Sequence, residues 1–241
     1  MITLYQFPIS HYCEKVRWSL DYKQLDYRVK NLLPGLHVMK TKELAGHSSV
    51  PILVDKNKVI QGSAHIITYL DKNFPQPGLT PDDLQFKEQA LKWERYVDKE
   101  IGPHIRRSFY HILLQHPDVV IPFFTHNGPW YGKLILRRIF PKLKNRMQSL
   151  MNINELSARE SQQKMAVAIE RLHQHYLQHD FLVGNQFTRA DLAAASLLAP
   201  FCMPEKYGLD WPERLPLELE DLIRQFQQKT DWVNDMYAQF R

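Results

Sequence analysis

The sequence has few cysteines and glycines and no long apolar run. Two cysteines among 241 residues exclude a disulfide framework, which favours a reducing compartment, and we expect a cytoplasmic protein. No stretch is long and apolar enough for a transmembrane helix, and the first residues lack the basic, apolar and small-residue regions of a signal peptide. The nine glycines are not spaced as in a phosphate loop or a dinucleotide-binding fingerprint, so neither motif is present.

Acidic residues are absent from one segment, residues 119–154, which carries six lysines and arginines. The chain has 31 basic and 26 acidic residues in total, so outside these six the two signs nearly balance. A nucleic-acid-binding surface spread over the whole protein is therefore not predicted. His175 and His179 are four residues apart, but a surface helix explains them better than a metal site, so no metal is expected.

A hydroxyl and a thiol lie three residues apart where the first helix is expected to begin. Ile2, Leu4 and Phe7 predict a short strand, and Ser10 and Cys13 follow it in the loop that leads into the helix. The N-terminus of a helix favours an anion, so this is a suitable place for thiolate chemistry. Cys13 and Ser10 are therefore both candidate catalytic residues, although the simpler roles are a small buried residue and a helix cap.

The chain divides at a Pro/Gly-rich segment, residues 74–78. Before it, the pattern predicts strands at 50–55 and 59–61 and a helix from Ser63. After it, apolar residues recur at helical spacing, which predicts helices only, with a break at Gly102–Pro103 and an irregular region at 116–141 that contains four prolines. We therefore expect an α/β domain at 1–78, a linker at 79–84 and an all-α helical bundle at 85–241.

Four motifs together resemble the glutathione S-transferase superfamily. They are Ser10-x-x-Cys13-x-x-Val16-Arg17, the Val50–Pro51 step, the segment 63–70 (SAHIITYL), and the segment 184–191 (GNQFTRAD), in which Thr188 and Asp191 form a helix cap. The resemblance covers both halves of the chain. It implies a thioredoxin-like N-terminal domain of order βαβ-α-ββα, glutathione as co-substrate and a homodimer.

The resemblance also implies which residues hold glutathione. The Ser10 hydroxyl would donate a hydrogen bond to the sulfur, the backbone before a cis Pro51 would pair with the cysteinyl part, and the helix start at Ser63 would bind the γ-glutamyl carboxylate. Gly62 stands where many relatives have an acidic or amide residue. The expected glutathione-binding residues are Ser10, Tyr12, His37, Val50, Pro51, Gly62 and Ser63.

Three functions are compatible with this resemblance. The first, which we expect, is conjugation of the glutathione thiolate to a small hydrophobic electrophile. The second is a glutathione-dependent thiol oxidoreductase that uses Cys13, although the position of the first cysteine of such motifs is occupied by Ser10. The third is a non-catalytic binding or regulatory protein with the same fold. Tyr12 is a second candidate for the activating hydroxyl.

The basic segment 119–154 also contains five aromatic residues. Basic and aromatic residues together suit weak contact with an anionic membrane surface or a lid over the electrophile site. An excursion packed on the C-terminal domain is the third interpretation, and the sequence does not decide among them.

Overall fold

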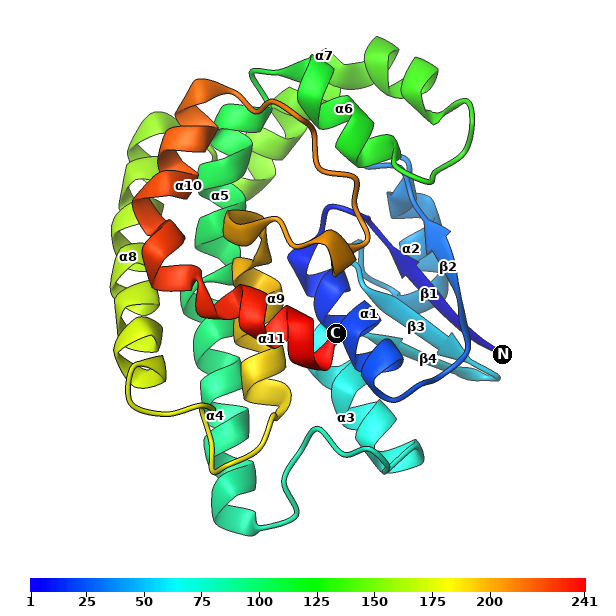
Figure 1. Cartoon of the computed structure of the whole chain (residues 1–241). Helices are drawn as coiled ribbons and strands as arrows, with labels where there is room; N and C mark the ends of the chain where they lie inside the picture. Colours follow the sequence, from blue (N-terminus) through cyan, green and yellow to red (C-terminus); the bar gives the residue numbers. More distant parts are fainter.

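The computed structural model describes residues 1–241 and begins with a small α/β domain (Figure 1). Its elements are β1 (Ile2–Gln6), α1 (His11–Tyr22), β2 (Tyr27–Asn31), α2 (His37–Ala45), β3 (Ile52–Asp55), β4 (Lys58–Gln61) and α3 (Ser63–Asn73). The sheet order is β2-β1-β3-β4, with β2 parallel to β1 and the other two pairs antiparallel. The expected thioredoxin-like order βαβ-α-ββα is confirmed.

Alternating apolar residues fix this sheet against its helices. Ile2 and Leu4 of β1 point to one face, where they pack with Val16 of α1 and with Ile66 and Leu70 of α3 in a buried cluster. This face of β1 is therefore buried in the core of the α/β domain. The loop 7–10 follows the C-terminal end of β1 and faces the helical domain. The strand pattern therefore places Ser10 at the start of α1.

The rest of the chain is helical, as expected. Its elements are α4 (Leu84–Glu100), α5 (Gly102–Leu113), α6 (Pro117–Thr125), α7 (Gly132–Met151), α8 (Glu155–Tyr176), α9 (Arg189–Cys202), the short 3₁₀ helix η1 (Glu205–Tyr207), α10 (Leu217–Thr230) and α11 (Trp232–Phe240). Helix α9 is almost entirely buried at the centre, because α1, α4, α10 and α11 all pack around it. None of the helices is long and apolar enough to span a membrane.

The prediction of an irregular region at 116–141 is wrong, because α6 and α7 occupy most of it. Pro117 lies in the first turn of α6, where a missing N–H costs nothing. Pro122 and Pro141 lie inside their helices. Apolar residues of both helices are buried where α6 and α7 pack together, which stabilises the helices despite the backbone hydrogen bonds that these prolines remove.

The two domains share one large hydrophobic core. Trp18 of α1 is fully buried and stacks near Phe187 and Tyr237 of the helical domain. Its indole Nε1 donates a hydrogen bond of 2.7 Å to the carbonyl of Phe240, at the end of α11. The N-terminal domain is therefore packed against the helical domain through α1, and the two domains share one buried apolar cluster.

Candidate functional site

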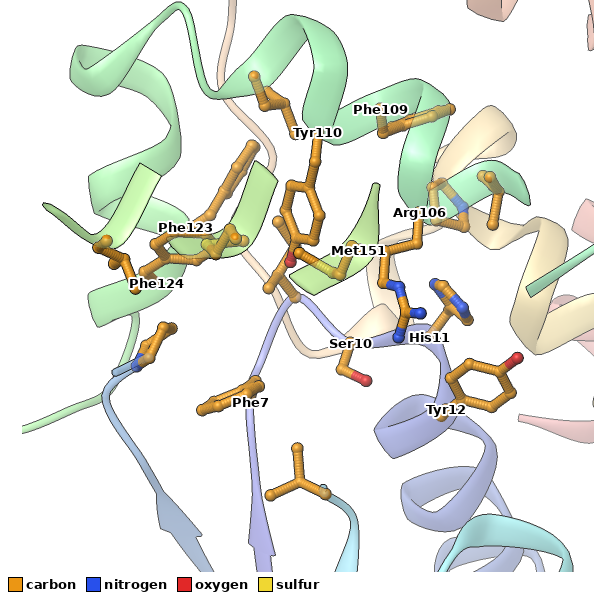
Figure 2. Close-up of a pocket in the computed structure, with 18 of the residues that line it drawn as sticks. Phe7, Ser10, His11, Tyr12, Arg106, Phe109, Tyr110, Phe123, Phe124 and Met151 are labelled. Atoms are coloured by element: carbon orange, nitrogen blue, oxygen red, sulfur yellow. The ribbon is translucent and has the colours of Figure 1, made fainter. Parts of the chain in front are cut away.

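A cavity lies between the two domains, with a volume of about 600 Å³ (Figure 2). On the α/β side it is lined by the loop 7–12, by the start of α2 and by residues 48–50. On the helical side it is lined by α5, α6, α7 and the segment that follows α9. Twenty of its 31 lining residues are hydrophobic. Such a cavity suits an apolar ligand that meets a few polar groups at one end.

Ser10 is the polar residue at the mouth of this cavity where α1 begins. Its hydroxyl oxygen accepts a hydrogen bond of 3.3 Å from the backbone N–H of Cys13, so the expected helix-cap role is confirmed. A hydroxyl has one donor and two acceptor positions, and this cap uses one acceptor. The cap leaves the Ser10 O–H uncommitted, but this hydrogen also interacts with the buried Cys13 thiol, so it reaches a ligand in the cavity by turning away from that sulfur.

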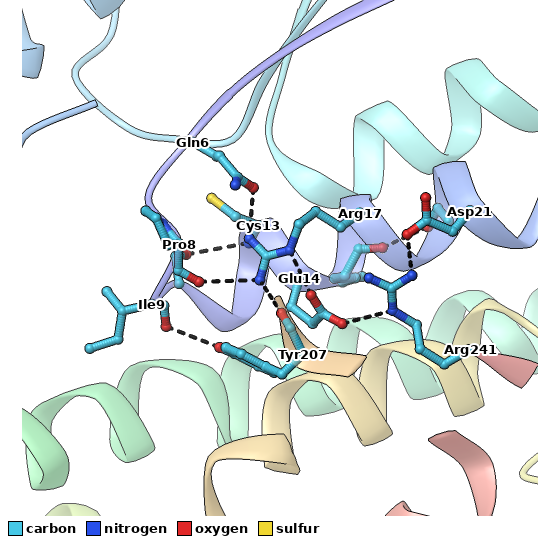
Figure 3. A network of polar contacts seen from close by, with 12 residues as sticks. Gln6, Pro8, Ile9, Cys13, Glu14, Arg17, Asp21, Tyr207 and Arg241 are labelled. Atoms are coloured by element: carbon cyan, nitrogen blue, oxygen red, sulfur yellow. Dashed lines mark hydrogen bonds and ion pairs between the residues drawn. The ribbon is translucent and has the colours of Figure 1, made fainter. Parts of the chain in front are cut away.

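Cys13 lies away from the cavity, one turn inside α1. Its side chain is fully buried and does not line the cavity wall. Burial raises the pKa of the Cys13 thiol, and the hydrogen bond with Ser10 and the charge of Arg17 offset this only in part. Figure 3 shows the thiol beside Arg17, which binds Glu14 and the Pro8 and Tyr207 carbonyls. The position of Cys13 argues against catalysis and for a small packing residue.

Tyr12 lines the cavity, but its hydroxyl is directed elsewhere. The phenol donates a hydrogen bond of 2.7 Å to the backbone carbonyl of Asp98 in α4. Burial and the Asp98 charge raise the pKa of Tyr12. Gly102 leaves room for this phenol, since a Cβ at that position would lie 1.9 Å from the Tyr12 oxygen. Tyr12 therefore joins the two domains, and its hydroxyl is not available to a ligand in the cavity.

The residues expected to hold glutathione form two groups. Val50 lines the cavity beside Ser48 and Ser49, and the Val50–Pro51 peptide bond is cis, as expected. Gly62 and Ser63 lie just beyond the cavity, and the Gly62 N–H donates a hydrogen bond of 3.0 Å to the Pro51 carbonyl. Gly62 has a φ of +93°, which favours glycine there. A path from Ser10 past Val50 to Ser63 thus follows this edge of the sheet.

His37 and Gln61 support the loops at this edge. The His37 ring lies 4.7 Å from the Phe7 ring, and its Nδ1 accepts a hydrogen bond of 3.1 Å from the Gly35 N–H. Burial lowers the pKa of His37. The Gln61 amide donates to the carbonyls of His47 and Ser49 at 3.2 and 2.7 Å, which fixes the loop that leads to Val50. His37 lines the cavity, whereas Gln61 acts on its border.

Helix α5 contributes cavity residues that sequence reasoning missed. Arg106, Phe109, Tyr110 and Leu113 recur at helical spacing and all line the cavity. The sequence held one signal for this: Arg106 is a cation within an otherwise apolar stripe of α5, and positions in such a stripe normally face the core. Next to it, His11 is buried with its Nε2 unpartnered. Burial, with the Arg106 charge, lowers the pKa of His11 to about 3, so this ring is neutral.

The segment 119–154 divides between the cavity and the surface. Phe123 and Phe124 of α6 and Met147 of α7 line the cavity, so part of this segment forms its outer wall. Trp130 is 91% exposed and lies outside the cavity lining. The wall position agrees with the packed-excursion and lid interpretations of this segment.

Comparison with known proteins identifies the family. The fold joins a thioredoxin-like domain to a helical domain, with a cavity between them. Models of the glutathione S-transferase N-terminal and C-terminal domains match residues 4–78 and 133–239. The chain belongs to the glutathione S-transferase superfamily.

Curated relatives are similar to part of the chain. Glutathione S-transferase Z2 of Arabidopsis thaliana is 33% identical over 115 residues, 46% of this chain and 52% of the relative. A stringent starvation protein A homologue of Pasteurella multocida is 33% identical over 81 residues, 34% of this chain and 38% of the relative. The chain thus spans about half or less of the length of these curated relatives.

Solved structures extend the likeness in fold to the whole chain. A glutathione S-transferase from Xanthobacter autotrophicus has a TM-score of 0.65 at 16% identity, with 99% of this chain and 93% of that chain covered. Similarity at this level concerns the fold, which is shared over both domains.

Proposed function

We propose that the protein is a glutathione transferase that adds the glutathione thiolate to a small, mostly hydrophobic electrophile. One observation carries this proposal: the Ser10 hydroxyl, whose cap bond uses only an acceptor position, lies where α1 begins and lines an apolar cavity. Family membership supplies glutathione as the co-substrate.

Ser10 acts on the sulfur through its hydrogen. A free thiol has a pKa of about 8.5, so little thiolate exists at neutral pH. A hydrogen bond donated to the anion, together with the N-terminus of α1, lowers that pKa and orients the nucleophile. The thiolate then attacks the electrophile held against α5 and α6, a new sulfur–carbon bond forms, and a leaving group departs or the electrophile is protonated.

Glutathione is held along the edge of the sheet. The backbone N–H and carbonyl of Val50 form no hydrogen bond within the chain, so both can pair with the cysteinyl part of the tripeptide. Ser63 begins α3, whose first N–H groups favour a carboxylate. His37 and Lys42 border the same end of the cavity, where the glycine carboxylate would lie. Pro51 and Gly62 shape this edge through their mutual backbone hydrogen bond.

The test compares three hydroxyl variants by steady-state conjugation kinetics at saturating glutathione. Ser10→Ala should lower the rate about tenfold or more, since tenfold corresponds to about 1.4 kcal/mol of barrier. Ser10→Thr retains both the cap and the hydroxyl and should keep most activity. Tyr12→Phe should leave the rate within about twofold. Equal rates for Ser10→Ala and the unmodified protein would contradict the proposal.

Two further measurements, thioltransferase activity of Cys13→Ala and calorimetry with glutathione, separate the two other functions. A thiol oxidoreductase would lose activity in Cys13→Ala. The burial of the Cys13 thiol and its raised pKa disfavour this function. A binding protein would retain glutathione in calorimetry and turn over none of a broad panel of electrophiles.

Two further expectations belong to this proposal. We expect a homodimer, to be checked by analytical ultracentrifugation. Weak contact with an anionic membrane surface remains a prediction for α7, where Arg137, Arg138 and Lys142 are exposed beside exposed Leu134. Binding to anionic vesicles that is lost at high salt would support it.

A further inference from the structure

The cavity between the domains contains positive charge and no acidic residue. Lys42, Arg106 and Arg146 are its charged lining residues, and neither aspartate nor glutamate contributes to the wall. None of these three side chains forms an ion pair or a hydrogen bond within the protein. A cleft with apolar walls and charge of one sign focuses the potential and attracts ligands of the opposite sign.

The three cations lie in different parts of the cavity. Lys42 belongs to α2, on the side of Val50, where the carboxylates of glutathione account for it. Arg106 and Arg146 belong to α5 and α7, which form the wall for the electrophile. Glutathione bound along the sheet edge leaves these two without a partner.

Arg106 is the cation directed toward the reacting end. Figure 2 shows its guanidinium extending from α5 toward Ser10 and His11. The Arg106 charge contributes to the lowered pKa of His11 and partly offsets the raised pKa of Tyr12, which agrees with this position. Because His11 is neutral and the Tyr12 hydroxyl is bound to the Asp98 carbonyl, neither neighbour neutralises the guanidinium.

We propose that Arg106 binds a carboxylate on the electrophilic substrate, so that the preferred substrates are aromatic electrophiles that carry an acid group. This rests on the transferase function proposed above. A guanidinium matches a carboxylate with two parallel hydrogen bonds, and the Arg106 side chain is exposed and so can be reached by a ligand. The neighbouring rings of Phe109, Tyr110 and Phe123 supply an apolar wall for the aromatic part. Arg106 is thus a specificity-determining residue.

The test uses ethacrynate and its methyl ester as electrophiles. Both carry the same reactive enone, and only the first carries a carboxylate, which is remote from the reacting carbon. The unmodified protein should show a kcat/KM for the acid about tenfold or more above that for the ester. Arg106→Gln should remove this preference by lowering kcat/KM for the acid about tenfold while that for the ester stays within about twofold. Arg106→Lys should restore part of the preference.

A matched control is Arg138→Gln, because Arg138 is exposed on α7 and outside the cavity lining. It should leave both substrates unchanged, which separates a local contact from the general positive field. Three results would overturn the proposal: no preference for the acid in the unmodified protein, equal slowing of both substrates in Arg106→Gln with a shifted pH–rate profile, or the same loss in Arg138→Gln. The second would assign Arg106 to the thiolate instead.

A binding measurement separates this proposal from the transferase function. The analogue of ethacrynate with a saturated enone cannot react, so calorimetry can compare its binding with that of its methyl ester without glutathione. The acid should bind about tenfold more tightly than the ester to the unmodified protein and equally to Arg106→Gln. Absence of turnover with this binding difference retained would contradict only the transferase function. Equal binding of acid and ester would contradict the anion site.

Discussion

At the scale of single residues, the site is built from side chains whose polar atoms are largely committed to the protein. Tyr12 and Cys13 follow Ser10 closely in the sequence, yet the Tyr12 hydroxyl donates to the Asp98 carbonyl and the Cys13 thiol is buried. The cap bond of Ser10 uses only an acceptor, so its hydrogen is shared with no group other than the buried Cys13 thiol. The choice among three neighbouring nucleophile-activating candidates is thus made by hydrogen-bond direction and burial.

His11 predicts a pH dependence of stability. Its pKa is about 3 in the folded protein, because of burial and the Arg106 charge, against about 6.5 when unfolded. As the pH falls below about 6.5, the unfolded state takes up a proton that the folded state does not, so stability decreases. This contribution approaches about 1.4 kcal/mol per pH unit near pH 5.

Urea denaturation between about pH 6.5 and pH 5 would measure this effect, above the ordinary titration range of carboxyl groups. His11→Asn should flatten the dependence, and His47→Asn, at an exposed position, should not. Burial also lowers the pKa of His37 and His104, but both residues are present in all variants and cancel in the comparison. Parallel curves for the unmodified protein and His11→Asn would refute the assignment.

At the scale of elements, α6 forms a wall of the cavity in which the electrophile is proposed to bind. Phe123 is 5% exposed, lines the cavity and lies edge-on to Trp211 at 6.3 Å between ring centres. Phe123→Leu removes ring area while keeping an apolar side chain. We expect kcat/KM for bulky aromatic electrophiles to change several-fold while the KM for glutathione stays unchanged, because α6 is on the far side of the cavity from Val50.

Trp130→Leu is the matched control for α6, since Trp130 is exposed and outside the cavity. It should leave kinetics with every electrophile unchanged. Steady-state kinetics over a size series of neutral electrophiles would measure both variants. A change in specificity with Trp130→Leu and none with Phe123→Leu would place the electrophile elsewhere.

The elements also show where sequence reasoning succeeds. The strand predicted at 50–55 is observed as Ile52–Asp55, and the predicted helix from Ser63 is observed as well. Both follow from local patterns, a short apolar run after Val50–Pro51 and apolar residues at helical spacing after Ser63. The cap at Thr188 and Asp191 is confirmed, with the Asp191 carboxylate accepting from both the N–H and the hydroxyl of Thr188 at 2.9 Å. Helix α6 was missed because its prolines oppose a helix locally, whereas a helix over 132–151 was foreseen with an interruption at Pro141 that the structure does not show.

A site between the two domains is what the family resemblance implies, but the place of Arg106 in its wall was beyond sequence reasoning. Ser10 and Val50 were identified through motifs of one domain, but Arg106 has no motif and acquires its role only because α5 packs opposite the loop 7–12. The apolar stripe that contains Arg106 predicts a buried helix face and not an interface with a cavity. The helical side of the site could not be predicted because α5 carries no motif and reaches the loop 7–12 only through long-range packing.

At the scale of the whole molecule, a buried ionic network joins the two domains. Lys15 of α1 donates hydrogen bonds to Asp98 at 2.8 and 2.9 Å and lies 2.8 Å from Glu94, which is 1% exposed. Arg189 of α9 pairs with the other Glu94 oxygen at 2.7 Å and reaches the Ala64 carbonyl of α3 at 2.9 Å. Burial alone would raise the pKa of Glu94, but the charges of Lys15 and Arg189 lower it by more, so the net shift of this pKa is downward.

Glu94→Ala should therefore destabilise the protein by about 3–5 kcal/mol, because it leaves buried cations partly unpaired. Glu88→Ala, at an exposed position of the same helix α4, should change stability by less than about 0.5 kcal/mol. Urea denaturation followed by tryptophan fluorescence and by circular dichroism would measure both variants. The two signals should coincide in one transition, since the domains share a core, and two separate transitions would contradict this coupling.

The bond between Trp18 and the Phe240 carbonyl joins residues 222 positions apart in the chain. Trp18 is covered by Phe187 and Tyr237, and Glu14 beside it is bound by Arg241 at 3.0 Å. During synthesis, α1 leaves the ribosome long before the segments that cover it exist. We therefore expect an apolar face of α1 to stay open to water in the nascent chain until α11 is made.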